Sequence, residues 1–178
     1  MSTKTSMTDR MLGALRLQEA TYEEIEADKD ATDEAAFVVV ASAFVAAAGH
    51  ALMEHGEADT GIAAGVGALV GWALSAWIAL FVGTRLLPGK KTKADWGEVA
   101  RAVAYANTPR FFLIFIAIPG IGPIVQTLVG VWVLAATVVA MRAAFDIETG
   151  RAIAVALLSA FAQGVVVSVL LLWIASWG

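Results

Sequence analysis

Hydrophobic residues along this chain gather in long stretches that contain no Asp, Glu, Lys or Arg. Four such stretches occur, at residues 35–53, 60–84, 111–141 and 152–178. A helix needs roughly 20 residues to cross a hydrocarbon core of about 30 Å, and each stretch is long enough to do so. The pattern therefore predicts an all-α integral membrane protein, with a polar segment at residues 1–33 and a membrane domain at residues 34–178.

The third stretch is too long for one helix, and the residues PGIGP at 119–123 divide it. Two prolines around two glycines indicate a tight hairpin, so we expect five transmembrane helices, of which the third is short or broken. Residues 111–118 alone would give only about 12 Å of helix at 1.5 Å per residue. Either the third helix begins near Arg101 and carries Arg110 into the membrane, or the 119–123 turn re-enters the membrane without crossing it.

All 12 Lys and Arg residues lie on one side of the membrane in the five-helix arrangement. The connections at 54–60 and 119–123 contain none of them, so the positive-inside rule places the N-terminus in the cytoplasm and the C-terminus outside. A single tilted span over residues 110–142 would instead leave Arg142 and Arg151 on the outer side. Four helices are therefore the less favoured arrangement.

Residues 9–30 are predicted to form one amphipathic cytoplasmic helix, with Asp9 as its N-cap. One face is built from residues spaced three and four apart, namely Met11, Leu15, Gln18, Tyr22 and Ile25. The rest is acidic, because 9 of the 16 Asp and Glu residues fall within residues 9–34, and they lack the spacing of a calcium-binding loop. We expect this helix to pack on the protein's own basic connections or on a partner protein, with Glu23, Glu24 and Asp28 as candidate contacts.

Composition and motifs restrict the chemistry that this chain can perform. Its mean hydropathy is +0.74 and it has no cysteine, which excludes disulfides, thiolate metal sites and a cysteine nucleophile. No phosphate-binding loop, nucleophile elbow or dinucleotide fingerprint is present. The histidine pair His50 and His55, with the carboxylate of Glu54 nearby, lacks a further ligand and the spacing of a zinc site. We therefore expect no enzyme activity, no cofactor, no metal ion and no nucleic-acid partner.

Two groups of small or polar residues fall inside the predicted membrane domain. The second helix carries small residues at four-residue spacing, which favours close helix packing within the chain or in a homo-oligomer; they are Ala63, Gly67, Gly71 and Ser75. In the third segment, Pro109 leaves a carbonyl near Tyr105 without its helical partner, and Thr108 or Arg110 could bond to it. If Arg110 lies near the bilayer centre, its insertion costs about 2.5–3.5 kcal/mol, and it should face the bundle interior.

Several of these elements together resemble a known family. They are the residues TYEEIEAD at 21–28, the run Arg101, Tyr105, Asn107, Thr108 and Pro109, the Pro/Gly turn, and Val131-Trp132. Over roughly residues 15–175 the chain resembles the bacterial Yip family, whose members share a domain with the Ypt-interacting proteins of eukaryotes. The resemblance implies a five-helix domain in the bacterial inner membrane with a cytoplasmic N-terminus. It brings no catalytic residue, and no GTPase-binding motif is present to transfer the eukaryotic partners.

Three functions are compatible with these observations. The leading hypothesis is a non-enzymatic membrane scaffold or adaptor that organises the lipid bilayer or an unknown membrane or cytoplasmic protein. The alternative is a small transporter or permease subunit that binds an anionic solute at the broken third helix through Asn107, Thr108 and Arg110. A lipid-modifying enzyme comes last, because only the two histidines and Glu54 support it.

Overall fold

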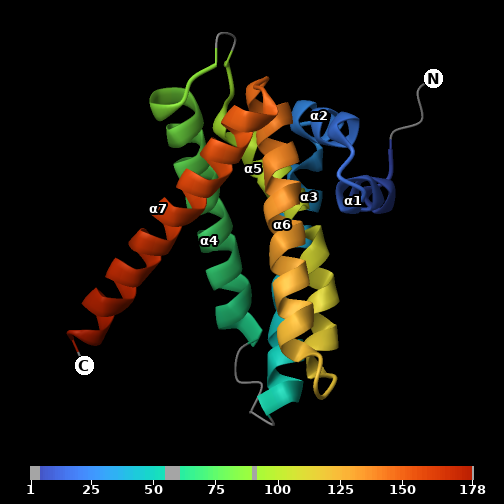
Figure 1. Ribbon diagram of the computed structural model, residues 1–178, viewed down its shortest axis with the longest axis vertical. Coiled ribbons are helices and arrows are strands. Elements are labelled where there is room, and N and C mark those ends of the chain that lie inside the picture. The colour runs from blue at the N-terminus through green and yellow to red at the C-terminus, as the bar shows by residue number, and fades with distance from the viewer. Residues whose placement is uncertain (1–4, 55–60, 90–91, 178) are drawn as a thin grey trace.

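The computed structural model describes residues 5–54, 61–89 and 92–177, and helices account for the regular structure in these ranges (Figure 1). Two short helices, α1 (Met7–Leu15) and α2 (Glu19–Ala27), precede the long helices α3 (Ala31–Glu54) and α4 (Gly61–Phe81). A π-helical turn, η1 (Val82–Leu86), extends α4. The chain continues through α5 (Trp96–Ala106), the 3₁₀ helix η2 (Thr108–Ala117), α6 (Gly122–Phe145) and α7 (Thr149–Ala175).

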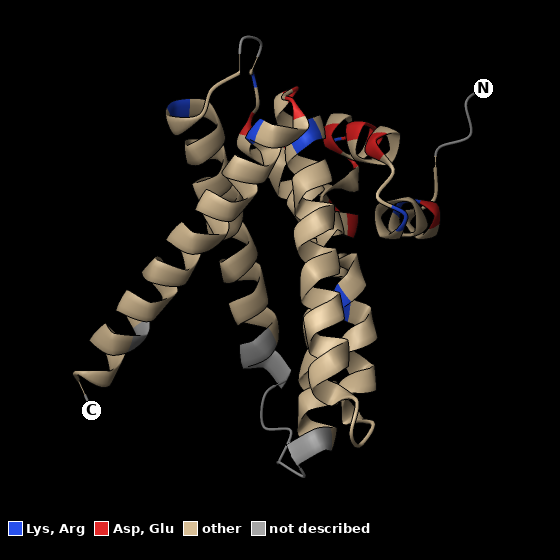
Figure 2. Ribbon diagram, viewed as in Figure 1, with Lys and Arg blue, Asp and Glu red and all other residues tan. Residues whose placement is uncertain are grey.

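Four helical stretches are long and apolar enough to cross a membrane. They are Ala31–Leu52, Gly65–Leu86, Gly122–Phe145 and Thr149–Ala175. Figure 2 shows the acidic and basic residues gathered at one end of the bundle, beside α1 and α2, whereas the shafts of the long helices carry almost no charge. The all-helical membrane class predicted from the apolar stretches is therefore confirmed.

The segment before the hairpin is a helix that changes type. Asp95 begins α5 with a capping box, in which its carboxylate accepts from the Glu98 amide and Glu98 accepts from the Asp95 amide. At the break, Thr108 Oγ1 donates to the Tyr105 carbonyl at 2.6 Å, which confirms one of the two partners expected beside Pro109. The 11 residues of α5 and 10 of η2 together are about 36 Å long at 1.5 and 2.0 Å per residue.

The chain reverses at Pro119 and Gly120, where Gly120 has a φ of +87°, a backbone conformation that glycine adopts readily. Gly122 and Pro123 already belong to the first turn of α6, so the reversal is tighter than the predicted 119–123 turn. Figure 1 shows it at the end of the bundle where α3 ends and α4 begins. From there α6 returns alongside η2, with Trp132 stacked on Phe112 at 5.3 Å between ring centroids.

The prediction of one helix over residues 9–30 was wrong. The chain turns between α1 and α2 at Leu17, whose φ is +57°, and Ser6 rather than Asp9 is the N-cap, since its hydroxyl accepts from the Asp9 amide at 3.2 Å. Gly13 faces the side chain of Thr21 so closely that a Cβ at Gly13 would overlap it. The two helices therefore fold against each other, and this packing offsets the roughly 1–2 kcal/mol that a left-handed leucine costs.

Close helix contacts occur at glycines outside the predicted small-residue series. A Cβ at Gly49 of α3 would overlap the carbonyl oxygen of Leu113 in η2, and one at Gly83 would lie 2.6 Å from the Phe145 ring. By contrast, beyond the neighbouring backbone of their own helix, no heavy atom of the described residues lies within 4 Å of a Cβ at Gly67 or Gly71. The latter two glycines border a cavity instead.

Candidate functional site

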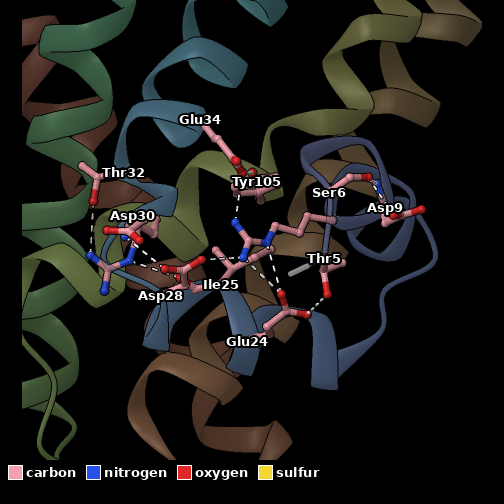
Figure 3. Close-up of polar contacts among 12 residues, drawn as sticks. Thr5, Ser6, Asp9, Glu24, Ile25, Asp28, Asp30, Thr32, Glu34 and Tyr105 are labelled. Carbon is pink, nitrogen blue, oxygen red and sulfur yellow. Dashed lines mark hydrogen bonds and ion pairs between the residues drawn. The ribbon is translucent and has the colours of Figure 1, made fainter. Parts of the chain in front are cut away.

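Arg10 of α1 is enclosed by three carboxylates at the charged end of the bundle. Its side chain is 2% exposed, and its Nη2 lies 3.1 Å from Glu24 Oε1 and 2.6 Å from Asp28 Oδ2. Its Nη1 lies 3.0 Å from Glu34 Oε2. Figure 3 shows the three acids turned towards this guanidinium. Burial alone lowers the pKa of Arg10, but the hydrogen bonds to the three carboxylates outweigh it and raise the pKa above its ordinary value.

Tyr105 joins this cluster to the membrane domain. Its hydroxyl donates to Glu34 Oε2 at 2.9 Å, so Glu34 accepts from both Arg10 and Tyr105. Thr5 Oγ1 donates to Glu24 Oε2 at 2.9 Å. The Arg10 cluster, defined here as Arg10, Glu24, Asp28, Glu34 and Tyr105, therefore fastens α1 and α2 to α3 and α5.

Arg101 of α5 holds the C-terminal end of α2. Its side chain is 4% exposed, its Nε donates to the Ile25 carbonyl at 3.1 Å, and its Nη2 donates to the Glu26 carbonyl. Carbonyls in the last turn of a helix have no partner within the helix and lie at the negative end of its dipole, so a cation is well placed there. Arg101 also donates from Nη1 to Thr32 Oγ1 at 3.4 Å. This contact connects α2, α3 and α5.

The pKa of Glu26, on α2, lies well above its ordinary value. Burial, together with the charges of Glu98, Asp146 and Glu23, raises the pKa of Glu26 to about 7, although Arg101 acts in the opposite direction. Among the described residues, Glu26 Oε2 is buried without a hydrogen-bond partner. A buried carboxylate without a partner is stabilised by binding a proton, so α2 changes charge near neutral pH.

Two contacts with α6 complete the attachment of the N-terminal helices. Arg142 Nη2 lies 2.8 Å from Glu19 Oε2. The Trp132 indole donates to the Leu15 carbonyl at 3.0 Å, near the end of α1. The sequence indicated neither contact, because each requires α1 and α2 to fold back beside a helix more than a hundred residues away along the chain.

The membrane half contains a cavity of about 450 Å³ at the break between α5 and η2. Helices α3, α4, α6 and α7 contribute the other walls. Its polar lining residues are Ser42, Ser75, Asn107, Arg110, Thr137, Ser159 and Gln163. Most of these side chains donate to nearby backbone, as Asn107 does to the Val103 carbonyl at 2.8 Å and Thr137 does to the Val133 carbonyl at 2.8 Å.

Arg110 and Ser159 are exceptions in this lining. Within the part of the chain that the structure describes, Ser159 Oγ is buried without a hydrogen-bond partner, and the Arg110 guanidinium forms no hydrogen bond or ion pair with another described residue. Arg110 lies near the start of η2, and the rest of η2 after it is apolar. A charge in such an apolar shaft is unfavourable by several kcal/mol unless a partner or water compensates it. Arg110 is exposed at the border of the cavity, so the cavity offers a positive charge that no described residue compensates.

The candidate binding residues predicted from the sequence lie in two places. Arg101 and Tyr105 lie with Glu24 and Asp28 at the attachment of the N-terminal helices, whereas Asn107 and Arg110 line the cavity. Thr108 and Pro109 are buried between them. Glu23 is exposed beside the Arg10 cluster. Gly67, Gly71 and Ser75 line the cavity, while the side chains of Ala63 and Glu54, and all of His55, lie outside the described residues.

The chain matches the model of a known protein family. A family model described as the Yip1 domain matches residues 12–171, which include both the attachment of the N-terminal helices and the cavity. No curated protein and no solved structure matches the chain.

Proposed function

Because the chain belongs to the Yip1 domain family, we propose that it is a non-enzymatic membrane scaffold or adaptor that organises lipids or partner proteins. In this proposal the four long helices and the α5–η2 segment make five crossings of a bacterial inner membrane. Helices α1 and α2 then lie in the cytoplasm, and the C-terminus lies on the outer side. The one-sided charge distribution in Figure 2 supports this orientation.

Two features of the N-terminal helices support the adaptor proposal, namely their attachment to the bundle and their acidic surface. Arg10 and Arg101 turn inward and are buried, whereas several acids of the same region are exposed to solvent, namely Asp9, Glu23, Asp30 and Asp33. Leu12 is also exposed on α1. An acidic surface with an exposed leucine is suited to a partner protein with a basic, partly apolar face, because complementary charge steers association.

Crosslinking in native membranes, followed by mass spectrometry, tests the adaptor function. The double charge reversal Glu23→Lys/Asp33→Lys is expected to abolish a specific crosslinked partner, because both residues are exposed on the proposed surface. The control is Glu148→Lys, which reverses an exposed acid in the connection between α6 and α7. A partner retained by the double variant, or catalytic turnover by the purified protein, would contradict the proposal.

A second candidate function is a small transporter or permease subunit for an anionic solute. The cavity favours it, because Asn107 and Arg110 lie at the broken third segment, and discontinuous helices often line transport sites. Thr108 supports the break through its bond to Tyr105 and does not line the cavity. The test is solute flux into proteoliposomes, with Arg110→Gln as the variant. Equal flux in empty liposomes would exclude transport of the anions tested.

A further inference from the structure

The cavity brings together two polar groups that lack partners within the described chain. Arg110 comes from η2 and Ser159 from α7, and both line the same volume of about 450 Å³. They lie 49 positions apart in the sequence, and only the packing of α7 across α4 and α6 brings them to one cavity. An exposed guanidinium and a buried hydroxyl that border one cavity of this size are features of a ligand site, which commonly has a volume of about 300–1,000 Å³.

The lining determines the charge of the ligand. Among the described residues, the lining contains Arg110 as its cation and no Asp, Glu or Lys, so the cavity attracts an anion. Guanidinium groups form forked hydrogen bonds with carboxylate and phosphate oxygens. The Ser159 hydroxyl can donate a further hydrogen bond to such an oxygen. The remaining walls are mostly apolar, with Val39, Val133, Leu134 and Met141 among them.

We propose that this cavity binds a phosphate-type oxyanion through Arg110 and Ser159. The oxyanion can be a free phosphate or the headgroup of an anionic lipid, since both present the same oxygens to the guanidinium. This assignment goes beyond the adaptor function and deepens the transport candidate, with which it shares the cavity. Binding is measured at equilibrium, so an absence of flux would exclude transport and leave the anion site standing.

Equilibrium binding to the full chain tests the site. The protein is placed in nanodiscs of phosphatidylcholine, and binding of radiolabelled inorganic phosphate is measured. In a second arm, phosphatidic acid is added to the nanodiscs, and retained lipid is counted by native mass spectrometry after dilution into phosphatidylcholine. Saturable phosphate binding identifies a free anion, whereas retention of phosphatidic acid alone identifies a lipid headgroup. Either result supports the site when it depends on the cavity residues.

Variants establish that dependence. Arg110→Gln is expected to weaken binding about tenfold or more, and Ser159→Ala about threefold, in line with the loss of charged and neutral hydrogen bonds. The control is Lys93→Gln, which removes an exposed cation outside the cavity and is expected to bind as the unaltered protein does. If Arg110→Gln fails to fold, Arg110→Lys is used instead. It keeps the positive charge but cannot form the two parallel hydrogen bonds of a guanidinium, so it is expected to bind the anion more weakly than the unaltered protein does. The proposal is overturned if neither ligand binds, or if binding is unchanged in the Arg110 and Ser159 variants.

Discussion

Replacing Arg10 with glutamine removes the cation from a group of three carboxylates. The Glu24, Asp28 and Glu34 side chains would then face one another at distances set for a shared guanidinium. Breaking a buried ion pair by removing one partner costs about 3–5 kcal/mol. The three acids here are 40%, 19% and 36% exposed, so water screens part of their repulsion. We expect Arg10→Gln to destabilise the attachment of α1 and α2 by about 2–3 kcal/mol.

Hydrogen exchange of the detergent-solubilised protein, read peptide by peptide, measures this change. Amides in α1 and α2 should exchange about 30- to 150-fold faster, since each 1.4 kcal/mol corresponds to a factor of ten. Amides in α4 and α7 should be unaffected, because among the described residues neither helix packs extensively against α1 or α2. The matched control is Arg16→Gln, which removes an exposed arginine just beyond the end of the same helix.

A second variant separates lost attraction from repulsion among the acids. Adding Glu34→Gln and Asp28→Asn to Arg10→Gln removes two of the three negative charges, so protection should return in part. Equal exchange in Arg10→Gln and the unaltered protein would refute the reasoning. So would the absence of any recovery in the triple variant, because the loss would then come from packing alone.

The remaining predictions concern pH, packing and one hydrogen bond. The pKa of Glu26 is raised from 4.5 to about 7, so its contribution to the stability of the folded state is present below pH 4.5 and is lost as the pH rises through 7. Glu26→Gln should therefore be more stable than the unaltered protein at pH 8, by about 1–2 kcal/mol after screening. Chemical unfolding at pH 5 and pH 8 measures this difference in stability, which should be smaller at pH 5. Gly49→Ala should destabilise the folded protein by about 1–3 kcal/mol and lower its thermal midpoint, because the new Cβ would overlap the Leu113 carbonyl. The control Gly164→Ala places its Cβ in open space among the described residues and should not lower the midpoint. Trp132→Phe keeps an aromatic ring but loses the donor to the Leu15 carbonyl, so limited proteolysis should cleave α1 faster, by a factor matching about 1 kcal/mol.

The membrane helices could be predicted from the sequence because hydrocarbon leaves the backbone few alternatives. Each backbone group there needs a partner within its own helix, so an apolar run of sufficient length is already a strong structural signal. Local chemistry was predictable for the same reason at Pro109, where a missing amide frees a carbonyl and Thr108 is near enough to bond to it. Leu17 gave no such signal, because neither glycine nor proline marks the turn between α1 and α2.

The roles of the arginines could not be predicted from their spacing. Along the chain, Arg10 and Arg101 counted as charges that orient the protein in the membrane, and Arg110 differed from them only by its place beside the broken third helix. In three dimensions, Arg10 meets three carboxylates, Arg101 meets the carbonyls at the end of α2, and Arg110 faces the cavity. Each of these surroundings is assembled from helices distant in the sequence, so only tertiary packing distinguishes the three residues.

The α5–η2 segment is the part of the fold that the two sites share. Tyr105 donates from its hydroxyl to Glu34 of the Arg10 cluster and accepts through its carbonyl from Thr108 at the break. A substitution such as Tyr105→Phe removes the hydroxyl from the Arg10 cluster and leaves the carbonyl that Thr108 binds. Among the described residues, Arg10 pairs with carboxylates of the N-terminal attachment, and Arg110 lines the cavity. Partner binding that depends on α1 and α2 but survives Arg110→Gln would thus establish the two sites as separable functions of one membrane domain.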